Sequence, residues 1–424
     1  MEETYSLLLQ ALKAALKGEK TAWKDEIPAR GWAGLFELAE RQHILPLVYD
    51  AVYDTVAARG ADPKMMAVYR QRTIQTVMMQ TRKTEDFTAL YQKLCEGGIS
   101  PIVVKGIICR DLYPNPDYRI SGDEDLLIPV EQFPLFHSLM QDLGMECADP
   151  RMDIGREYEV PYRKKGSPLY IEAHKSLFPP NSEAYGDLNV YFSDVEDRAI
   201  EVVSGGVRIR TMGYTDHLFY LLCHAYKHFL HSGVGIRQAC DIILMANANG
   251  ADIDWSRILK QCREIHAELF ATAIFQIGEA HLVFDPDKAQ SPEEWRRIRV
   301  DGQPLLNDMQ SGGSYGAADA GRAHSSTVTL NAVTARKRGK KGKASFVRSV
   351  FPRASDLRGR YPWLRTKPFL LPVAWIKRIL GYIGEIKSGG GSSVSESIRI
   401  GEQRVELLRT YGILEADDAR AGNV

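Results

Sequence analysis

The chain has 424 residues, 44% of them hydrophobic and 25% charged, which is ordinary for a water-soluble protein of two or three domains. Lys plus Arg and Asp plus Glu both number 54, so the net charge excludes the uniformly basic surface of a nucleic-acid coat protein. The six cysteines form no Cys-x-x-Cys pair, which excludes a zinc ribbon and favours reduced thiols in a cytoplasmic protein.

Neither a signal peptide nor a membrane span is predicted. The opening segment MEETYSLLLQALKAALKGEK carries early acids and reads as an amphipathic helix. The most apolar stretch, FLLPVAWI at residues 369–376, is far shorter than the roughly 20 residues that a membrane span needs. We therefore expect no transmembrane segment and assign FLLPVAWI to packing in a core, with a role at a membrane surface, suggested by the following Lys377-Arg378, as the alternative.

Residues 1–95 predict an N-terminal helical region. Apolar residues recur at three- and four-residue spacing in GWAGLFELAERQHILPLVYDAVYD and again in the segment that begins MMAVYRQRTIQ. The second segment ends at Gly97-Gly98, a typical helix stop.

The period of the pattern changes after residue 95. ISPIVVKG and GDEDLLIPV predict two strands, separated by a short helix and a proline-rich loop. A helix over VEQFPLFHSLMQDLGM follows, and EYEVPYRKKGSPLYIEAHKSLF predicts a hairpin with its turn at KKGS. Residues 96–210 therefore predict the core of an α/β (α+β) protein, a small mixed sheet flanked by helical regions on both sides.

Beyond the core, residues 211–300 predict a helical domain that packs on it. Residues 301–345 are rich in Gly, Ser and Lys and predict a flexible basic linker or insertion, and residues 346–424 predict a C-terminal helical region and tail. The basic tract at 336–343 is typical of a solvated loop. Contact with nucleic acid is the alternative, although no aromatic residues are interleaved for base stacking.

Acidic residues begin the second predicted strand. Because side chains alternate along a strand, Asp123 and Asp125 share one face and Glu124 points to the other. The Cα atoms of Asp123 and Asp125 would lie about 6.6 Å apart. Carboxylates so placed can converge on divalent cations such as Mg²⁺. Glu172, with His174 on the same face of a later strand, offers a third carboxylate. A solvated strand edge is the alternative interpretation.

The turn after the first strand is the candidate phosphate site. Gly106 permits close approach of a phosphate to backbone N–H groups, and Lys105 can supply a positive charge. Arg119 can add a bidentate phosphate contact. The alternatives are a lysine that faces water, and an arginine that bridges to Asp117 or to an acid of the metal cluster.

A later helix carries a stripe of polar residues at positions i, i+3, i+4 and i+7, formed by His224, Lys227, His228 and His231. We predict that this stripe faces the cleft and contacts the nucleotide, with a plain solvated face as the alternative. The H-x-x-x-H spacing fits zinc poorly because no third ligand is evident. Arg237 and Asp241 predict an ion pair on a helix surface, with Arg237 reaching the site as the alternative.

Taken together, VVKG, LYPNPDYR, GDEDLLI, IEAHKSLF and LCHAYKHFLHSGVGIRQACDI resemble the bacterial uncharacterised nucleotidyltransferase family, within the polymerase-β-like nucleotidyltransferase superfamily. The pattern is K-G, then R-x-x-x-D-x-D, then E-x-H. The segment FPRASDLRGRYPWLRTKPFLLPVAWIKRI resembles that family too, so the resemblance covers about residues 30–285 and 346–380.

The resemblance implies transfer of a nucleoside monophosphate from an NTP to an acceptor hydroxyl, with release of pyrophosphate. It makes Asp123, Asp125 and Glu172 the catalytic and metal-binding residues, with Mg²⁺ as the ion and Mn²⁺ as its alternative. The acceptor is an unidentified small molecule, protein or RNA. The predicted nucleotide-binding residues are Lys105, Gly106, Arg119, His174, His224, Lys227 and His228.

Two other functions remain open. One is a catalytically degenerate core that binds a nucleotide or a partner, which the retention of all three acids argues against. The other is a toxin-type enzyme that modifies RNA or protein, for which the basic tract at 336–343 is the only indication.

Overall fold

The computed structural model of the protein describes residues 2–182, 184–313, 367–377 and 394–414, together with Leu357, Tyr361 and Leu364. By its internal contacts the chain divides into two compact units. The first comprises residues 1–224, 236–262 and 274–299, and the second comprises residues 225–235, 263–273 and 300–424. The domain boundaries expected from the sequence remain a proposal.

Helices account for the amino-terminal part, as predicted. In order they are α1 (Glu2–Leu16), α2 (Ala29–Arg41), α3 (Leu45–Val52), the short 3-10 helix η1 (Ala57–Gly60) and α4 (Pro63–Glu96). The long helix α4 begins after Asp62, whose side chain accepts a hydrogen bond from the backbone N–H of Lys64. It ends at Gly97, and Gly98 follows with a φ of 85°, which confirms the predicted Gly-Gly stop.

A seven-stranded mixed sheet forms the centre of the first unit, with strand order β3-β4-β5-β2-β1-β7-β6. Its strands are β1 (Ile102–Val104), β2 (Glu124–Leu127), β3 (Glu146–Cys147), β4 (Glu159–Arg163), β5 (Tyr170–His174), β6 (Ile200–Ser204) and β7 (Val207–Thr211). Between them lie α5 (Gly106–Arg110), η2 (Pro116–Tyr118), η3 (Val130–Gln132), α6 (Phe133–Asp142) and η4 (Leu188–Phe192). The α+β fold class with helical flanks is therefore confirmed.

Strand pairing brings together the two segments that the sequence singled out. β2 is antiparallel to β1 and parallel to β5, so that Asp125 lies opposite Val104 on one side and Glu172 on the other. β4 and β5 form the predicted antiparallel hairpin, whose turn contains Gly166 at a φ of 80°. The register of this hairpin places Glu159 opposite His174.

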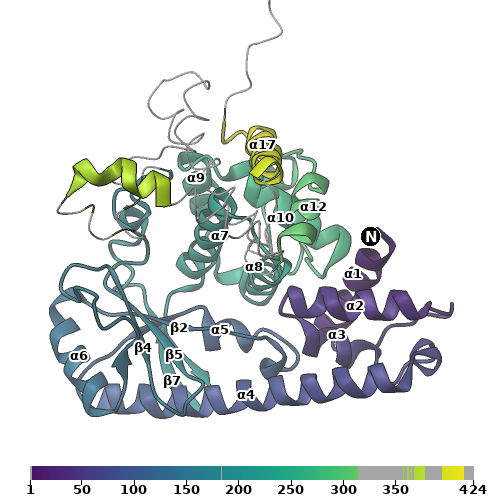
Figure 1. Ribbon diagram of the computed structural model, residues 1–424, viewed down its shortest axis with the longest axis horizontal. Coiled ribbons are helices and arrows are strands. Elements are labelled where there is room, and N and C mark those ends of the chain that lie inside the picture. The colour runs from purple at the N-terminus through teal and green to yellow at the C-terminus, as the bar shows by residue number, and fades with distance from the viewer. Residues whose placement is uncertain are drawn as a thin grey trace, which may run out of the picture. The chain divides into compact units, whose positions relative to one another are not determined.

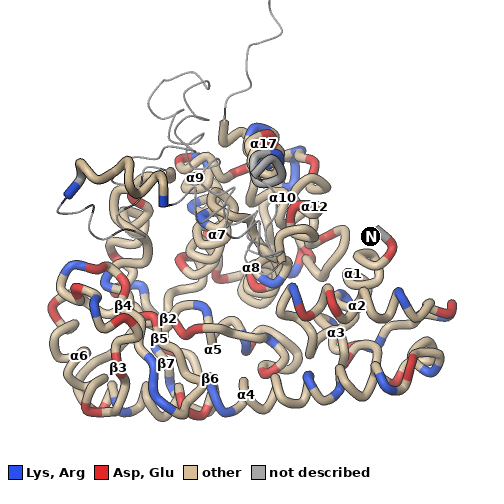
Figure 2. Tube along the Cα trace, viewed as in Figure 1, with Lys and Arg blue, Asp and Glu red and all other residues tan. Residues whose placement is uncertain are grey.

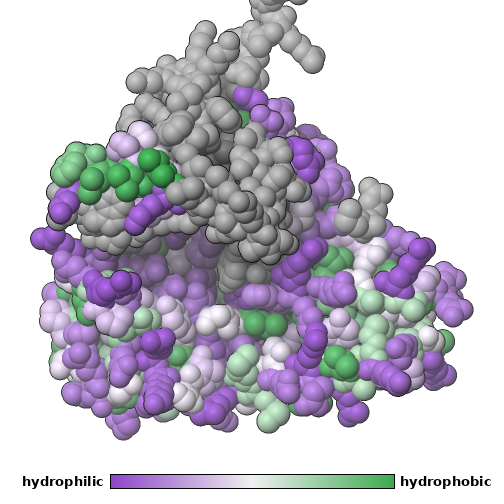
Figure 3. All heavy atoms as spheres, in the orientation of Figure 1, coloured by the Kyte–Doolittle hydropathy of each residue, from purple (hydrophilic) through white to green (hydrophobic). Residues whose placement is uncertain are grey.

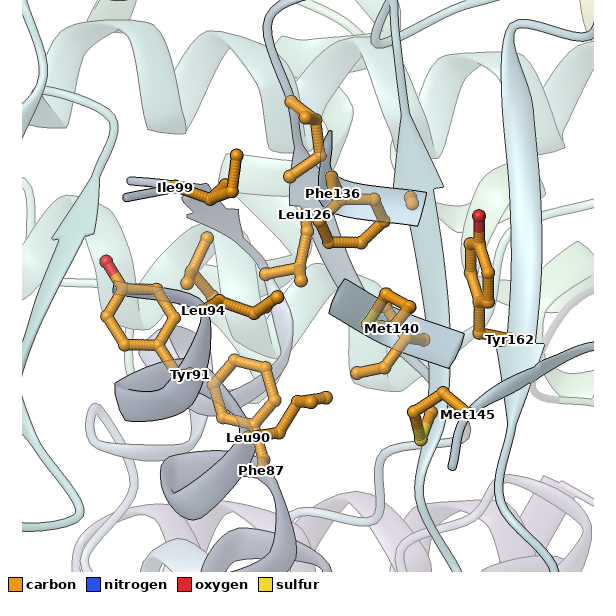
Figure 4. Close-up of a cluster of buried hydrophobic side chains, with 14 of the residues drawn as sticks. Phe87, Leu90, Tyr91, Leu94, Ile99, Leu126, Phe136, Met140, Met145 and Tyr162 are labelled. Atoms are coloured by element: carbon orange, nitrogen blue, oxygen red, sulfur yellow. The ribbon is translucent and has the colours of Figure 1, made fainter. Parts of the chain in front are cut away.

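One face of the sheet is buried by α4 and α6. Leu126, Ile171 and other alternate strand residues pack against aromatic and aliphatic side chains of these two helices. Figure 4 shows Phe87, Leu90, Tyr91 and Leu94 of α4 beside Phe136 and Met140 of α6. Because side chains alternate along a strand, burying Leu126 leaves Asp125 on the opposite face. The core thus determines which face of the sheet carries the acids.

The outer side of α4 faces solvent. In Figure 1 this helix runs beneath the strands, and Figure 3 shows mainly hydrophilic residues there, interrupted by scattered hydrophobic ones. Val68, Ile74, Met78 and Met79 are exposed on it. Single exposed hydrophobic residues of this kind are normal for a protein surface.

The hairpin of β6 and β7 was not predicted. Its register pairs Ser204 with Val207, and the two intervening residues, Gly205 and Gly206, have φ values of 56° and 77°. Two consecutive positive φ angles are typical of a type I′ turn, which glycine favours. The alternating segment EVVSGGVRIR carried this signal.

Further helices follow the sheet in the sequence. They are α7 (Tyr214–His231), α8 (Ile236–Asn249), η5 (Gly250–Asp252), α9 (Trp255–Glu264), α10 (Glu268–His281) and α11 (Glu293–Arg296). The prediction of helices over residues 216–249 is confirmed. Asp216, in the first turn of α7, is buried and accepts hydrogen bonds from Arg198 and Arg257.

The second unit contains α12 (Gln303–Gly312), η7 (Pro368–Leu370) and α17 (Val394–Thr410). Arg404 of α17 forms a buried ion pair with Asp308 of α12, at 2.9 Å. α12 shows that the first part of the segment predicted to be a flexible linker is helical. The basic tract at 336–343 lies outside the described residues.

Part of the apolar segment 369–376 packs in this unit. Ala374 is buried in a small cluster with Leu357 and Leu364, whereas Phe369 is 74% exposed. Within the described part of the chain, no helix combines the length and the apolar character needed to cross a membrane.

Candidate active site

The three consecutive acids at β2 divide between the two faces of the sheet. Glu124 is fully buried and accepts hydrogen bonds from the backbone N–H of Ile107 and from Arg110 Nη2, both at 2.7 Å. Lys83 Nζ lies 3.9 Å from the same carboxylate. These cations and the amide compensate the burial of Glu124, so this acid joins α4, α5 and β2. It is a structural residue, which leaves Asp125 for chemistry.

Gly106 makes the turn after β1 possible. Its φ is 43°, and a Cβ atom added there would lie 1.9 Å from Glu124 Oε2. Lys105 precedes it with a φ of 55°, a conformation that is costly for a residue with a side chain. The N–H of Ile107 is taken by Glu124, and that of Lys105 donates to His217 Nε2 at 3.2 Å. Neither amide is therefore available for the phosphate contact expected at this turn.

Replacing Gly106 by Ala is expected to destabilise the protein by more than about 2 kcal/mol, because the new methyl group displaces the buried Glu124 carboxylate. Urea unfolding measures the loss. Gly122→Ala is the matched control, since a Cβ atom at Gly122 has no neighbour within 4 Å. Equal stability of the two variants would contradict this account of the turn.

Asp125, Glu172 and His174 gather on the face opposite the core. Each offers one ligand atom, and these atoms all lie within 4.8 Å of one another. His174 Nε2 is 3.1 Å from Asp125 Oδ1 and 4.0 Å from Glu172 Oε2. Figure 2 shows acidic residues on β2, β4 and β5 of the sheet. Two carboxylates and an imidazole are a donor set that binds divalent metal ions.

The electrostatics of this group favour an added positive charge. Burial raises the pKa of Asp125, but the nearby Lys105 ammonium and His174 imidazole outweigh burial and lower that pKa to about 2. Burial, followed by the charges of Asp123, Asp125 and Glu159, raises the pKa of Glu172 to about 8. Asp125 is thus stable as a carboxylate, whereas at Glu172 burial and the neighbouring acids outweigh the Lys105 ammonium and favour the protonated form.

Asp123 lies beside the group, but its carboxylate oxygens are not among the converging ligand atoms. It is half-buried at the residue before β2, and its carboxylate is, after burial, the largest cause of the raised pKa of Glu172. The group whose ligand atoms converge consists of Asp125, Glu172 and His174, whereas the sequence predicted Asp123 in place of His174. The role of Asp123 as a ligand remains a proposal.

The metal-free protein should become more stable when Glu172 is replaced by Gln, by about 1–3 kcal/mol near pH 9, with little change near pH 5. The folded protein holds the Glu172 proton up to about pH 8, whereas the unfolded chain loses it near 4.5. Unfolding therefore releases a proton between these values, and stability falls as the pH rises through them.

Thermal unfolding in a chelator, at both pH values, measures this difference. The exposed Glu131, changed to Gln, is the control. A Glu172→Gln variant that is less stable than the parent near pH 9 would contradict the assigned repulsion.

Lys105 occupies the position between the acids and α7. Its Nζ lies 2.9 Å from Asp125 Oδ2 and 3.3 Å from His224 Nε2. Burial lowers the pKa of His217 to about 4, so this ring is neutral at physiological pH and can accept the Lys105 amide hydrogen. The prediction that His224 faces the acidic strands is consistent with its contact to Lys105, and the nucleotide roles of both residues remain proposals.

Arg119 is a buried structural bridge. Its Nε and Nη2 donate to the two carboxylate oxygens of Asp241 on α8, each at 2.7 Å, and the Tyr113 hydroxyl donates to the same carboxylate. Arg119 is 5% exposed. This corrects the expectation of a phosphate clamp, because the guanidinium already forms its bidentate pair. It also corrects the predicted Arg237–Asp241 surface pair: both residues are buried, and Arg237 donates to the backbone oxygen of Ile120.

Lys227 and His228 are half-buried residues of the second unit, and their predicted contact with a nucleotide remains a prediction. Among the described residues, the one convergent group of three metal-ligand side chains is that at Asp125, so the zinc alternative for His224 and His228 gains no support. All six cysteines are free thiols.

Glu159 and His217 were not singled out from the sequence, and Asp241 was paired there with Arg237 rather than with Arg119. Glu159 lies in the predicted hairpin, but a four-residue turn at KKGS would pair it with Glu172, whereas the observed loop over residues 164–169 places it opposite His174. His217 and Asp241 lie on helices more than 100 residues from their partners, Lys105 and Arg119. No local pattern indicates such contacts.

Comparison with known families identifies the chain. Residues 28–282 match a family described as uncharacterised nucleotidyltransferase, a range that includes the whole sheet and the convergent group at Asp125. Comparison with curated proteins and with solved structures gave no match. The matched range exceeds half of the chain, and its strands, acids and Lys-Gly turn are those on which the sequence resemblance rested. The protein therefore belongs to the uncharacterised nucleotidyltransferase family.

Proposed function

We propose that the protein is a metal-dependent nucleotidyltransferase. It moves a nucleoside monophosphate from an NTP to an acceptor hydroxyl and releases pyrophosphate. The observation that carries this proposal is the parallel pairing of β2 and β5, which sets Asp125 directly beside Glu172 on the face away from the core. Family membership supports the same reaction class.

Asp125 and Glu172 would hold the divalent ion, with Asp123 close enough to influence Glu172 by its charge. A divalent ion bound there would neutralise charge on the triphosphate and lower the pKa of the acceptor hydroxyl. The protein itself contributes rigid placement, because the carboxylates project from two paired strands backed by a close-packed core. Positioning of this kind supplies much of the catalysis in phosphoryl transfer.

Lys105 is the proposed phosphate ligand. Its backbone is fixed by the hydrogen bond to His217, and its ammonium lies between Asp125 and His224 at the end of β1. A lysine ammonium suits a triphosphate as a point charge. Gly106 serves in this scheme by close packing against Glu124, and Arg119 by donating toward the Gly106 carbonyl oxygen at 3.5 Å.

Incubation of the protein with each α-labelled NTP, Mg²⁺ or Mn²⁺ and a cell extract tests the proposal. Label should appear on a protein, RNA or small-molecule fraction, which identifies the acceptor class. The same NTP labelled at the γ position should leave its label in pyrophosphate. Label transferred from the γ position alone would indicate a kinase and overturn the proposed reaction.

A binding module that has lost catalysis would bind an NTP in this assay and transfer nothing from any of the four nucleotides. The ion-pairing of Asp125 and the closeness of Glu172 favour the enzyme, because both acids are retained in converging positions. A toxin-type enzyme would instead label RNA or protein. Deleting residues 314–343, which removes the basic tract, should abolish RNA labelling in that case and leave small-molecule labelling unchanged.

A further inference from the structure

His174 is a buried member of the group at Asp125. It is 4% exposed, and its Nε2 lies 3.1 Å from Asp125 Oδ1. Both Asp125 and Glu172 offer oxygens within 4.8 Å of this nitrogen. A carboxylate only accepts hydrogen bonds, so in this arrangement Nε2 must carry the hydrogen.

The other ring nitrogen is left without a hydrogen-bond partner. His174 Nδ1 is buried and makes no hydrogen bond, and the nearest carboxylate oxygen, Glu159 Oε2, lies 3.8 Å away. If the hydrogen of a neutral ring is on Nε2, then Nδ1 carries a lone pair and faces the Glu159 carboxylate, which can only accept hydrogen bonds. Moving the hydrogen to Nδ1 would direct it toward Glu159 Oε2, which is 3.8 Å away and would have to approach slightly to accept it, and would turn the Nε2 lone pair toward Asp125 and Glu172.

That second arrangement is the usual state of a histidine bound to a metal. Such a histidine binds through one nitrogen and donates its other N–H to a carboxylate or carbonyl oxygen. The hairpin register puts Glu159 directly opposite His174, so the acceptor for Nδ1–H is built into the sheet. With the hydrogen on Nδ1, this nitrogen has an acidic neighbour, and the Nε2 lone pair points to the space between the Asp125 and Glu172 carboxylates, where a cation would bind.

We propose that His174 coordinates a divalent metal together with Asp125 and Glu172, that Glu159 orients its ring, and that this site prefers a transition-metal ion such as Mn²⁺ to Mg²⁺. Mg²⁺ is a hard ion bound through oxygen, whereas imidazole nitrogen suits transition metals such as Zn²⁺ and Fe²⁺. Mn²⁺ also favours oxygen ligands, but as a softer ion it accepts an imidazole more readily than Mg²⁺ does. The inference deepens the proposed function and rests on it, because it specifies the class of metal at the same site.

Binding of Mn²⁺ alone to the full-length wild-type protein tests the inference without turnover. Electron spin-echo spectroscopy of bound Mn²⁺ should show coupling to an imidazole nitrogen, and Mn²⁺ should bind at least about tenfold more tightly than Mg²⁺ in competition. Bound Mn²⁺ without nitrogen coupling would show that the His174 ring does not coordinate the metal, which overturns the inference. Equal affinity for the two ions would overturn the preference.

Variants of the protein identify the side chain that supplies the nitrogen coupled to Mn²⁺. His174→Gln should remove the coupling and weaken Mn²⁺ at least about tenfold, while Mg²⁺ affinity changes by less than about threefold. Glu159→Ala should weaken Mn²⁺ by about 10–100-fold and leave the coupling visible at saturating metal. His281→Gln, at the end of α10, is the control and should change nothing. Coupling that survives His174→Gln would assign the nitrogen elsewhere and overturn the inference.

Failure here differs from failure of the proposed function. A protein that transfers nucleotides with Mg²⁺ and shows no nitrogen coupling keeps the function and loses the inference. Nitrogen coupling through His174 in a protein that transfers nothing keeps the metal site and removes the reaction.

Discussion

Replacing Asp125 by Asn is expected to lower the rate of nucleotidyl transfer by at least about a thousandfold. Asn keeps an oxygen that can accept from His174 Nε2, but it loses the negative charge that pairs with Lys105 at 2.9 Å. It also removes one of the two carboxylates that would hold the divalent ion. Transfer of α-label at saturating NTP and metal measures the change, with circular dichroism to confirm that the variant is folded.

Asp142→Asn is the matched control, because Asp142 is an exposed carboxylate at the end of α6 in the same unit. It should keep the parental rate. An Asp125→Asn variant that is folded and as active as the parent would remove the proposed reaction from this site.

The Asp123→Asn variant tests whether Asp123 is a metal ligand, as the sequence predicted, or lies outside the ligand group that converges in the structure. If Asp123 acts only through its charge on Glu172, its loss should slow transfer by about tenfold or less, well short of the effect at Asp125. An Asp123→Asn rate as low as that of Asp125→Asn would instead make Asp123 a metal ligand.

The second large effect is on stability. Arg119→Met is expected to cost about 3–5 kcal/mol, because it leaves the buried Asp241 carboxylate without its bidentate partner. The Tyr113 hydroxyl, at 2.8 Å, remains as a single neutral donor and cannot replace the lost charge. Urea unfolding measures the loss as a shift of the midpoint at unchanged slope.

The double variant Arg119→Met with Asp241→Leu should recover much of this loss, since removing both charges of a buried pair is often nearly neutral. A loss below about 1 kcal/mol in Arg119→Met, together with a large rise in KM for the NTP, would contradict the structural bridge and restore the phosphate clamp.

Local patterns in the sequence predicted much of the architecture. The apolar spacing of residues 1–95, the Gly97-Gly98 stop and the KKGS turn all specify backbone conformation over a few neighbouring residues, and each is confirmed. The side-chain alternation at β2 also separated Asp125 from Glu124 correctly.

Contacts between residues that lie far apart in the sequence could not be predicted in this way. Arg119 looked like a phosphate ligand because a free guanidinium before an acidic strand suits that role, yet its partner Asp241 lies 122 residues away. Glu124 was placed on the opposite face from Asp125, but its partners Arg110 and Lys83, which compensate its burial, could not be predicted. The role of such a charged residue depends on which opposite charge the packing of the chain brings near it.

By itself, the sequence determined the helices, the strands flanking the Lys105-Gly106 turn, and the family. These follow from periodicity, turn chemistry and a short motif, all of which act over a few residues. Only the tertiary structure decided that His174 and Glu159 join Asp125 and Glu172, and that Arg119 serves the fold. Strand register and helix packing bring those groups together, and a buried charge takes its role from the neighbours that compensate it.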